Sequence, residues 1–129
     1  MHSNESSENY LEAILVLSKR RPVVRSIDVA NYLNFSKPSV SVAMKNLRAK
    51  ELVEVSDEGY ITLTEAGSEI ANMIYERHTF LSELLIKLGV DSEIATEDAC
   101  SIEHRISKES FEALKNYVSL TMPLVEGKL

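Results

Sequence analysis

The chain has 129 residues, of which 44% are hydrophobic and 26% charged, and its formal net charge at pH 7 is −6. This length suits one core, or two small modules that share a long helix, and it excludes a multidomain enzyme. The apolar runs are too short to span a membrane and residues 1–8 are too polar for a signal peptide, so we expect a cytosolic protein with no membrane partner. The single cysteine, Cys100, cannot form an internal disulfide.

The charges are segregated along the chain. Residues 19–50 carry eight basic residues and one acidic residue, a net charge of +7, whereas residues 51–129 carry six basic and sixteen acidic residues, a net charge of −10. A basic segment inside an acidic protein is typical of a molecule with one face that meets phosphate. Residues 19–50 are therefore the candidate nucleic-acid-binding segment.

Three helices are predicted in the first half of the chain. The first runs from about residue 7 to residue 21, where an apolar stripe at helical spacing stops before Pro22. The second covers residues 26–33 and is followed by a turn at residues 34–35. The third begins after Ser36, which can act as its N-cap, and it tolerates a proline in its first turn because no helical N–H is needed there.

The third helix has two different sides. Val40, Met44 and Leu47 recur at helical spacing and are predicted to face the core. The opposite side is small, polar and basic, so that hydroxyls can bond phosphate or base edges and cations can neutralise the DNA backbone. A basic but merely solvated helix face is the alternative. The candidate DNA-binding residues are Ser36, Lys37, Pro38, Ser39, Ser41, Val42, Lys45 and Arg48.

A small β-hairpin follows the third helix. Residues 52–55 and 60–63 are β-rich runs, and the tetrapeptide 56–59 between them is turn-forming. Helix, helix, turn, helix and hairpin is the order of a winged helix-turn-helix. Because Asp57 and Glu58 at the tip of the wing would repel phosphate, we expect the wing to contribute shape rather than affinity.

The second half of the chain is predicted to be helical. The longest helix runs from residue 65 to residue 88, and two more follow at residues 92–105 and 108–120. Long helices often connect modules. We therefore predict a mainly α protein with a winged helix-turn-helix DNA-binding domain at residues 1–70 and a second, helical domain at residues 71–129.

A candidate metal site lies in this second half. Cys100, Glu103 and His104 stand at positions i, i+3 and i+4 of a predicted helix, so a thiol, a carboxylate and an imidazole share one face. Three ligands from one helix leave coordination positions open, which other segments must fill. The candidates for these positions are Asn9, Glu12 and His78.

Each of these residues also has an ordinary interpretation: a buried thiol, a solvated carboxylate, a surface imidazole. One alternative is a winged-helix regulator that responds to an organic ligand or to oxidation of Cys100. A partner-binding adaptor that has lost DNA is another. A small metalloenzyme is disfavoured, because no nucleophile, phosphate-binding loop or general base accompanies the ligands, so we expect no enzyme and no protein substrate.

The sequence resembles the metal-dependent repressors of the DtxR/MntR type over nearly its whole length. The resemblance implies a winged-helix domain followed by a helical metal-binding and dimerisation domain, here residues 71–129, with Fe(II) or Mn(II) as corepressor and palindromic operators near metal-uptake genes. The optional SH3-like third domain of the family is not expected in this chain. Ser36, Pro38 and Ser39 match positions that face DNA in the family. The matching motifs are ENYLE at 8–12, SKPSVS at 36–41, LTEAG at 63–67, RH at 77–78 and EDACSIEH at 97–104.

The resemblance also implies ligand roles, and these are mixed. Glu12, His78, Glu103 and His104 correspond to ligands of the manganese branch of the family. Cys100 is the residue that the iron branch uses where the manganese branch has glutamate, and Asn9 matches neither branch. Of the iron branch's ancillary site only His78 is retained, since Ser82 and Thr96 replace stronger ligands.

These observations predict a homodimeric, metal-dependent repressor. Metal binding is expected to set its two recognition helices about 34 Å apart, so that they enter successive major grooves of operator DNA. The dimer interface is expected to come from apolar positions of the last helices, such as Phe111, Leu114 and Val118, although their spacing fits an interface and a core equally. Fe(II) or Mn(II) is the expected cofactor, and Zn(II) is a possible substitute in a crystal.

Overall fold

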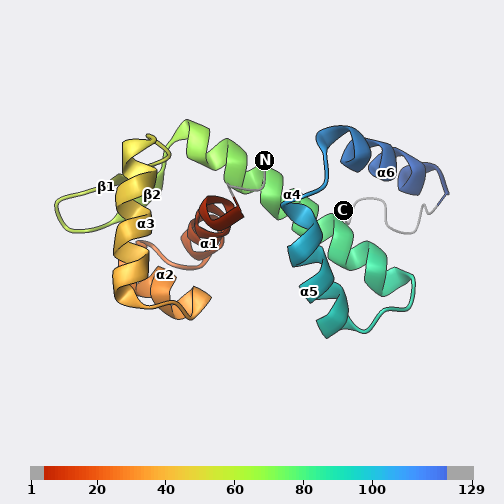
Figure 1. The fold of residues 1–129 in the computed structure, drawn as a ribbon, viewed down its shortest axis with the longest axis horizontal. Coiled ribbons are helices and arrows are strands. Elements are labelled where there is room, and N and C mark those ends of the chain that lie inside the picture. The colour runs from red at the N-terminus through yellow and green to blue at the C-terminus, as the bar shows by residue number, and fades with distance from the viewer. Residues whose placement is uncertain (1–4, 122–129) are drawn as a thin grey trace. The chain divides into compact units, whose positions relative to one another are not determined.

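The computed structural model describes residues 5–121, which form six helices and a two-stranded sheet (Figure 1). They fall into two compact units, one that ends at Met73 and one that begins at Ile74. The boundary lies inside one long helix, which contributes to both. The elements in chain order are α1 (Glu5–Arg20), α2 (Ser26–Leu33), α3 (Lys37–Ala49), β1 (Val53–Val55), β2 (Ile61–Leu63), α4 (Glu65–Lys87), α5 (Ser92–Glu103) and α6 (Lys108–Thr121).

The first unit is a winged helix-turn-helix, as predicted. Asn34 ends α2 in the left-handed conformation, with φ 61°, which asparagine tolerates better than most residues. Two residues later Ser36 caps α3, and its hydroxyl accepts a hydrogen bond from the amide of Ser39 at 3.3 Å. The helix before the turn, α2, covers the predicted range, and Arg25 is its N-cap because its amide donates to the Asp28 carboxylate.

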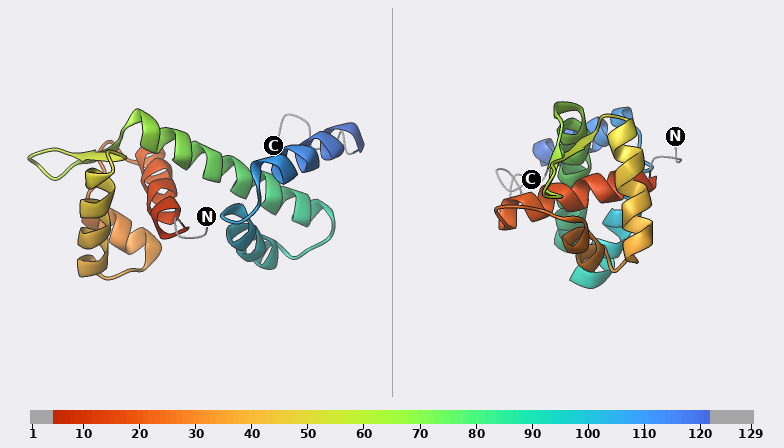
Figure 2. Two further views of the ribbon diagram at one scale, coloured as in Figure 1. Left: turned by 45° about the horizontal axis from the view of Figure 1, so that its top comes forward. Right: turned by 90° about the vertical axis from the view of Figure 1, so that its left-hand side faces the viewer.

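The hairpin is short and antiparallel. Val53 pairs with Leu63 and Val55 with Ile61, so each strand is one residue shorter than predicted. Gly59 closes the turn with φ 87°, a conformation in which a side chain is strained. Figures 1 and 2 show the loop of the hairpin extending beyond the helices beside α3, which is the arrangement of a wing.

The core of the first unit is built from the apolar faces of its elements. Contacts join α1 to α2, α3 and β2, and α3 to α2 and β1. Burying one large aliphatic side chain stabilises a fold by about 1.5–3 kcal/mol, so this core accounts for much of the unit's stability. The inward positions predicted for α3 are confirmed. The side chains larger than alanine that are at most 2% exposed here are Leu11, Ile14, Val24, Val29, Val40, Leu47 and Ile61.

The start of α4 lies very close to the main chain of the segment that connects α3 to β1. The Thr64 hydroxyl accepts from the amide of Gly67 at 3.1 Å and donates to the carbonyl of Glu51 at 2.8 Å. Gly67 is buried, and a Cβ at this position would overlap the carbonyl oxygen of Leu52. Only glycine therefore allows this contact.

The second unit has its own hydrophobic core, which corrects one sequence-based expectation. Phe111 and Val118 are 3% and 2% exposed and Leu114 packs beside them, so these residues form core rather than dimer interface. Phe80 and Phe111 meet edge to face, with ring centroids 5.5 Å apart. The buried members of this core are Phe80, Leu81 and Leu84 of α4, Ala99 of α5, and Phe111 and Val118 of α6.

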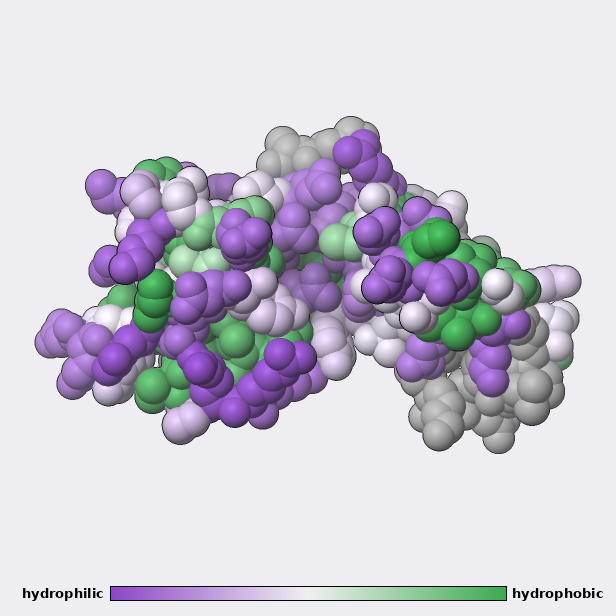
Figure 3. Space-filling model, turned by 90° about the horizontal axis from the view of Figure 1, so that it is seen from below, coloured by the Kyte–Doolittle hydropathy of each residue, from purple (hydrophilic) through white to green (hydrophobic). Residues whose placement is uncertain are grey.

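The surface of the second unit carries large apolar side chains. Figure 3 shows hydrophobic residues gathered on one side of this unit. Among the described residues, no helix combines the length and the apolar character that a membrane crossing requires. The most exposed large apolar side chains of α4, α5 and α6 and their connections are Ile86, Leu88, Ile94, Tyr117 and Leu120.

Candidate metal centre and nucleic-acid interface

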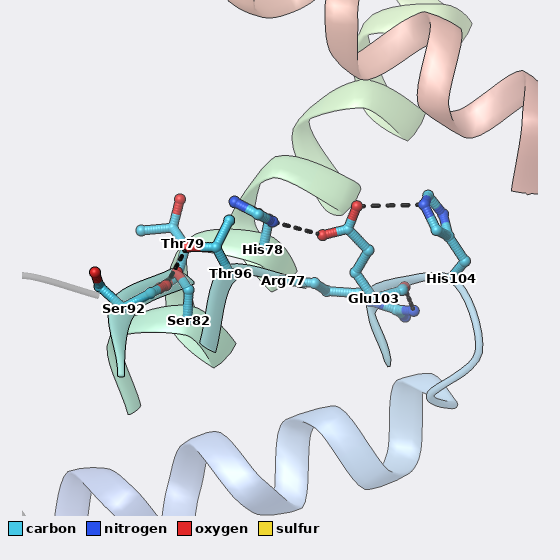
Figure 4. A network of polar contacts seen from close by, with 8 residues as sticks. All are labelled: Arg77, His78, Thr79, Ser82, Ser92, Thr96, Glu103 and His104. Carbon is cyan, nitrogen blue, oxygen red and sulfur yellow. Dashed lines mark hydrogen bonds and ion pairs between the residues drawn. The ribbon is translucent and has the colours of Figure 1, made fainter. Parts of the chain in front are cut away.

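The candidate metal centre is built around the buried carboxylate of Glu103. This residue is the last of α5, and its side chain has no exposed surface. His78, on α4, places Nδ1 3.0 Å from one carboxylate oxygen, and His104, the C-cap of α5, places Nε2 3.2 Å from the other. Figure 4 shows the two imidazoles approaching the carboxylate from opposite sides.

The electrostatics favour an ionised carboxylate at this point. Burial raises the pKa of Glu103, but the hydrogen bonds and positive charge offered by His104 and His78 outweigh burial, so the pKa of the carboxyl lies below its ordinary value. A buried carboxylate needs such partners, because an unpaired charge inside a protein is costly. The two imidazoles therefore stabilise the negative charge of the Glu103 carboxylate, and a bound metal cation could do the same.

Cys100 completes a convergent set of donor atoms. Its sulfur, a carboxylate oxygen of Glu103 and a ring nitrogen of His104 all lie within 4.8 Å of one another. Ligand atoms bound at about 2.0–2.3 Å to one ion are separated by roughly 3–4 Å, so small side-chain movements would bring all three to a common cation. The residues present thus fit a divalent transition metal, with sulfur, nitrogen and oxygen ligands.

The predicted ligands do not all belong to one unit. His78, Cys100, Glu103 and His104 lie in the second unit, and the structure brings His78 and His104 to the same carboxylate. Asn9 and Glu12 lie on α1 of the first unit, where both are half-buried. Their participation in the site stays a prediction.

The two residues that replace ancillary ligands of the iron branch are engaged with their own helices. The Ser82 hydroxyl donates to the carbonyl of Thr79 at 3.3 Å, and the Thr96 hydroxyl donates to the carbonyl of Ser92 at 2.8 Å (Figure 4). A hydroxyl that already bonds a helical carbonyl is a poor metal ligand. These contacts agree with a weakened ancillary site.

Sequence reasoning missed the role of Arg77. This residue is only 8% exposed, and its guanidinium donates to the carbonyls of Glu103 and Ile106. The available signal was its position, because Arg77 continues a buried stripe of α4 formed by Ile74, Leu81 and Leu84 at helical spacing. A basic residue on a buried stripe indicates a specific partner.

The predicted DNA-binding residues form one accessible surface. Every one of the eight is exposed, whereas Val40, Met44 and Leu47 on the other side of α3 are at most 4% exposed. A ligand can therefore reach Lys45 and Arg48, and near the start of α3 the exposed side chains of Ser36, Pro38, Ser39 and Ser41 are small. The eight exposed positions are Ser36, Lys37, Pro38, Ser39, Ser41, Val42, Lys45 and Arg48.

The contacts of Arg25 in the first unit were not predicted from the sequence. Arg25, the N-cap of α2, donates to the hydroxyl of Tyr60 at 3.2 Å, and its guanidinium lies 4.9 Å from the centre of the tyrosine ring. The amide of Ile61 also donates to the carbonyl of Val24 at 2.7 Å. The wing is thereby tied to the start of α2 by main-chain and side-chain contacts.

Comparison with known families places both units in one class of protein. Residues 2–60 match the family described as "Iron dependent repressor, N-terminal DNA binding domain". Residues 64–120 match the family described as "Iron dependent repressor, metal binding and dimerisation domain". Together with the fold and the donor set, these matches define a metal-dependent transcriptional repressor of the winged-helix class.

Individual relatives agree with this class. The transcriptional regulator MntR of Escherichia coli O6:H1 is 33% identical over 114 residues, which cover 88% of this chain and 74% of that protein. An HTH-type transcriptional regulator of Methanocaldococcus jannaschii is 35% identical over 118 residues, 89% of this chain and 94% of that protein. The chain belongs to the iron-dependent repressor family, which includes the MntR regulators.

A solved structure of the same family has a similar fold. The manganese regulator SloR superposes with a TM-score of 0.78 at 27% sequence identity. The match covers 87% of this chain and 53% of that chain, so the present chain spans about half the length of that relative. The sequence-based predictions of a winged helix-turn-helix followed by a helical domain, and of the DtxR/MntR family, are confirmed.

Proposed function

We propose that this protein is a cytoplasmic repressor that binds operator DNA as a homodimer when loaded with Fe(II) or Mn(II), and that it controls genes of metal homeostasis. Residues 1–70 would bind the operator, and residues 71–129 would bind the metal and dimerise. The observation that carries the proposal is the buried carboxylate of Glu103, flanked by two imidazoles and next to the Cys100 thiol. A family of repressors, rather than of enzymes, supports the regulatory role.

The metal ligands in this proposal come from both units. Their donor atoms are one sulfur, two imidazole nitrogens and oxygens from carboxylates and one amide, a mixed set that suits first-row divalent metals. Coordination through sulfur would favour iron or zinc over manganese, and Zn(II) could replace the native metal in a crystal. The proposed ligands are Asn9, Glu12, His78, Cys100, Glu103 and His104.

The proposal gives α1 the coupling role. This helix packs against α2, α3 and β2, so its position bears on that of the recognition helix. A bound cation would supply the positive charge that holds the Glu12 and Glu103 carboxylates at one centre. Glu12 and Asn9 would thereby be drawn from the first unit to the second, which fixes α3 of each subunit for its half-site.

The DNA-binding surface in this proposal is the exposed side of α3. The side chains of Ser36, Pro38, Ser39, Ser41 and Val42 are small enough for the helix to enter a major groove, and the three serine hydroxyls can bond to base edges or phosphates. Lys37, Lys45 and Arg48 would contact the phosphate backbone. In a symmetric dimer the two copies of α3 would lie about 34 Å apart, one turn of B-DNA.

The partner subunit would cover the exposed apolar residues of the second unit. The proposed contact residues carry large apolar side chains that the folded subunit leaves on its surface, and exposed apolar area of this kind marks protein interfaces. They replace Phe111, Leu114 and Val118, which belong to the core. The proposed interface residues are Ile86, Leu88, Ile94, Tyr117 and Leu120.

The proposal is tested by metal-dependent operator binding. An operator would first be selected with the Mn(II)-loaded protein from random duplexes of roughly 30 base pairs, long enough for two half-sites one helical turn apart. Its affinity would then be measured by fluorescence anisotropy with Mn(II), anaerobic Fe(II), Zn(II) or EDTA. We expect Fe(II) or Mn(II) to raise the affinity by at least about tenfold, which is a coupling free energy of about 1.4 kcal/mol.

The thermal stability of the protein gives a second readout. A metal that binds only the folded protein raises the free energy of unfolding by about 2.7 kcal/mol when its concentration is 100 times the dissociation constant. A regulator that responds instead to an organic ligand or to oxidation of Cys100 predicts equal operator affinity and equal melting temperature with and without metal. That result would contradict the proposal.

A further inference from the structure

One buried guanidinium joins three elements of the second unit. Arg77 of α4 donates through Nη1 to the carbonyl of Glu103, at 3.1 Å, and to the carbonyl of Ile106, at 2.8 Å. The same guanidinium lies 5.5 Å from the centre of the Phe111 ring of α6. Figure 4 shows Arg77 beneath the main chain of Glu103, on the opposite side from the carboxylate.

The two carbonyls need a donor for a general reason. The last carbonyls of an α-helix have no partner within the helix, and they form the negative end of the helix dipole. Glu103 is the last residue of α5, and Ile106 lies in the connection to α6. A guanidinium is always charged and presents several N–H groups in a rigid plane, so it can bond both carbonyls while its face rests on an aromatic ring.

We propose that Arg77 is a positioning residue of the metal centre. Arg77 fixes the end of α5, which carries the ligands Glu103 and His104. It thereby holds them close to His78, the residue that follows Arg77 in α4. The ligand-bearing turn is then held in place before any cation binds. This inference rests on the proposed function, because it assigns a role toward the metal ligands named there.

The chemistry of metal sites explains why such a residue matters. Ligand atoms must lie within a few tenths of an ångström of their ideal distances, and groups that orient the ligands change metal affinity by about 10- to 100-fold when they are removed. A lysine could replace the charge of Arg77 but not its planar, multiple donors. Orientation, rather than charge alone, is therefore the role assigned to Arg77.

A matched control is a second cation near the same ring. Lys115 of α6 lies 5.4 Å from the centre of the Phe111 ring, almost the same distance as Arg77. Its ammonium group pairs with the Glu76 carboxylate near the surface, whereas Arg77 bonds the end of α5. Substituting Lys115 therefore removes a cation from Phe111 and leaves the carbonyls of Glu103 and Ile106 bonded.

The experiment compares Arg77→Met, Arg77→Lys and Lys115→Met with the unmodified chain, and Co(II) is the probe. Affinity and the visible absorption of bound Co(II) report the ligand geometry. Hydrogen exchange of the Ile106 amide, which donates to the carbonyl of Ile102 at 3.0 Å, reports the order of this turn without metal. We expect Arg77→Met to lower Co(II) affinity by about 10- to 100-fold, to change the absorption spectrum, and to speed this exchange.

The controls separate positioning from stability. Lys115→Met should change Co(II) affinity by no more than about twofold, as surface substitutions do, and Arg77→Lys should lie between Arg77→Met and the unmodified chain. If Arg77→Met does not fold, Arg77→Lys carries the test. Unchanged Co(II) affinity, spectrum and exchange in the folded Arg77 variant, or an equal loss in Lys115→Met, would overturn the inference.

Failure of the proposed function gives a different result. In that case the unmodified chain binds Co(II) no more tightly than a chain with Glu103→Gln. The Arg77 inference then falls with it. If the unmodified chain binds Co(II) through Glu103 and the Arg77 variants bind it equally well, only the positioning role is wrong.

Discussion

The two units of this protein place their polar residues in opposite ways. In the first unit the polar and basic residues of α3 are all exposed, and a separate apolar face holds the helix in the core. In the second unit Arg77, Glu103 and His104 are at most 8% exposed, and Glu103 contacts both of the others, through its carbonyl to Arg77 and through its carboxylate to His104. In the first unit, the residues proposed to bind DNA thus differ from those that stabilise the fold. In the second unit, the residues proposed to bind or position the metal are themselves part of the buried interior.

This difference has an energetic basis. An exposed lysine or serine is solvated before and after folding, so it can be replaced at little cost to stability. A buried carboxylate or guanidinium loses its hydration on folding, and only its partners make up for that loss. Variants of these buried residues of the second unit should therefore change metal binding and stability together, whereas variants of the α3 surface should change DNA affinity alone.

The largest effect is expected for Glu103→Gln. The amide keeps the shape of the side chain and can still bond the two imidazoles, but it removes the negative charge at the centre of the donor set. Metal affinity, measured by calorimetric titration with Mn(II), should fall by more than about 100-fold, beyond the loss typical of residues that only orient ligands.

The matched control for this substitution is Glu97→Gln. Glu97 lies on the same helix and is exposed. The Mn(II) affinity of the Glu97→Gln variant should therefore stay close to that of the unmodified chain. Equal losses in the two variants would mean that the general negative charge of α5, and not the buried carboxylate, attracts the metal.

The next largest effect is expected for Gly67→Ala, which tests the contact between α4 and the end of α3. In an ordinary helix this change stabilises by up to about 1 kcal/mol. Here the new Cβ would meet the carbonyl oxygen of Leu52, so we expect the free energy of unfolding to fall by about 1–3 kcal/mol, the usual cost of overpacking. Urea unfolding measures whether the free energy of unfolding falls or rises in this variant. A rise would show that Gly67 does not approach the Leu52 carbonyl closely.

A smaller effect, confined to DNA binding, is expected for alanine at Lys45 or Arg48. If each subunit makes about four phosphate contacts, the logarithm of operator affinity should fall with the logarithm of salt concentration with a slope near −7. Removing one contact per subunit should make that slope less steep by about 2 in the dimer. The free energy of unfolding should change by no more than about 0.5 kcal/mol.

Lys108→Ala, an exposed cation of α6, serves as the control for the salt dependence. Its slope should equal that of the unmodified chain. If all three variants share one slope, or if operator binding does not depend on salt, the α3 surface is not the phosphate-binding face.

The smallest effect concerns the pH dependence of stability in the first unit. Burial raises the pKa of Asp28, but the amide of Arg25 and the guanidinium of Arg21 outweigh it, so the pKa lies below its ordinary value. A lowered pKa stabilises the fold above the unfolded value of about 3.9 and loses this contribution as the pH falls through the folded value. Asp28→Asn should therefore lower the free energy of unfolding at pH 7, by about 1 kcal/mol or less, and leave it nearly unchanged near pH 2. A loss of equal size at both pH values would contradict this assignment.

The fold could be predicted well because its signals are local. N-caps such as Ser36 and Asp91, the αL turn at Asn34 and the glycine of the wing each mark a boundary within a few residues. The differences at boundaries are small: each strand of the hairpin is one residue shorter than predicted, and α4 ends one residue earlier.

The parts that sequence could not give depend on which side of a helix is covered. Phe111 and Val118 fit an interface and a core equally well by spacing, and only the packing of α6 against Phe80 and Leu84 decides for the core. The spacing of Arg77 along α4 places it on the buried stripe of that helix, but it does not identify its partners, which are main-chain carbonyls from a different segment. The roles of the six proposed metal ligands and of the α3 surface stay predictions.

The central claim is that one cation is bound jointly by α1 of the first unit and by the donor set around Glu103. Anomalous diffraction from a crystal loaded with Mn(II) tests it most directly. We predict an ion within about 2.0–2.4 Å of oxygens of both Glu12 and Glu103 and of a nitrogen of His78. An ion bound by the second unit alone, with the Glu12 carboxylate far from it, would contradict the account.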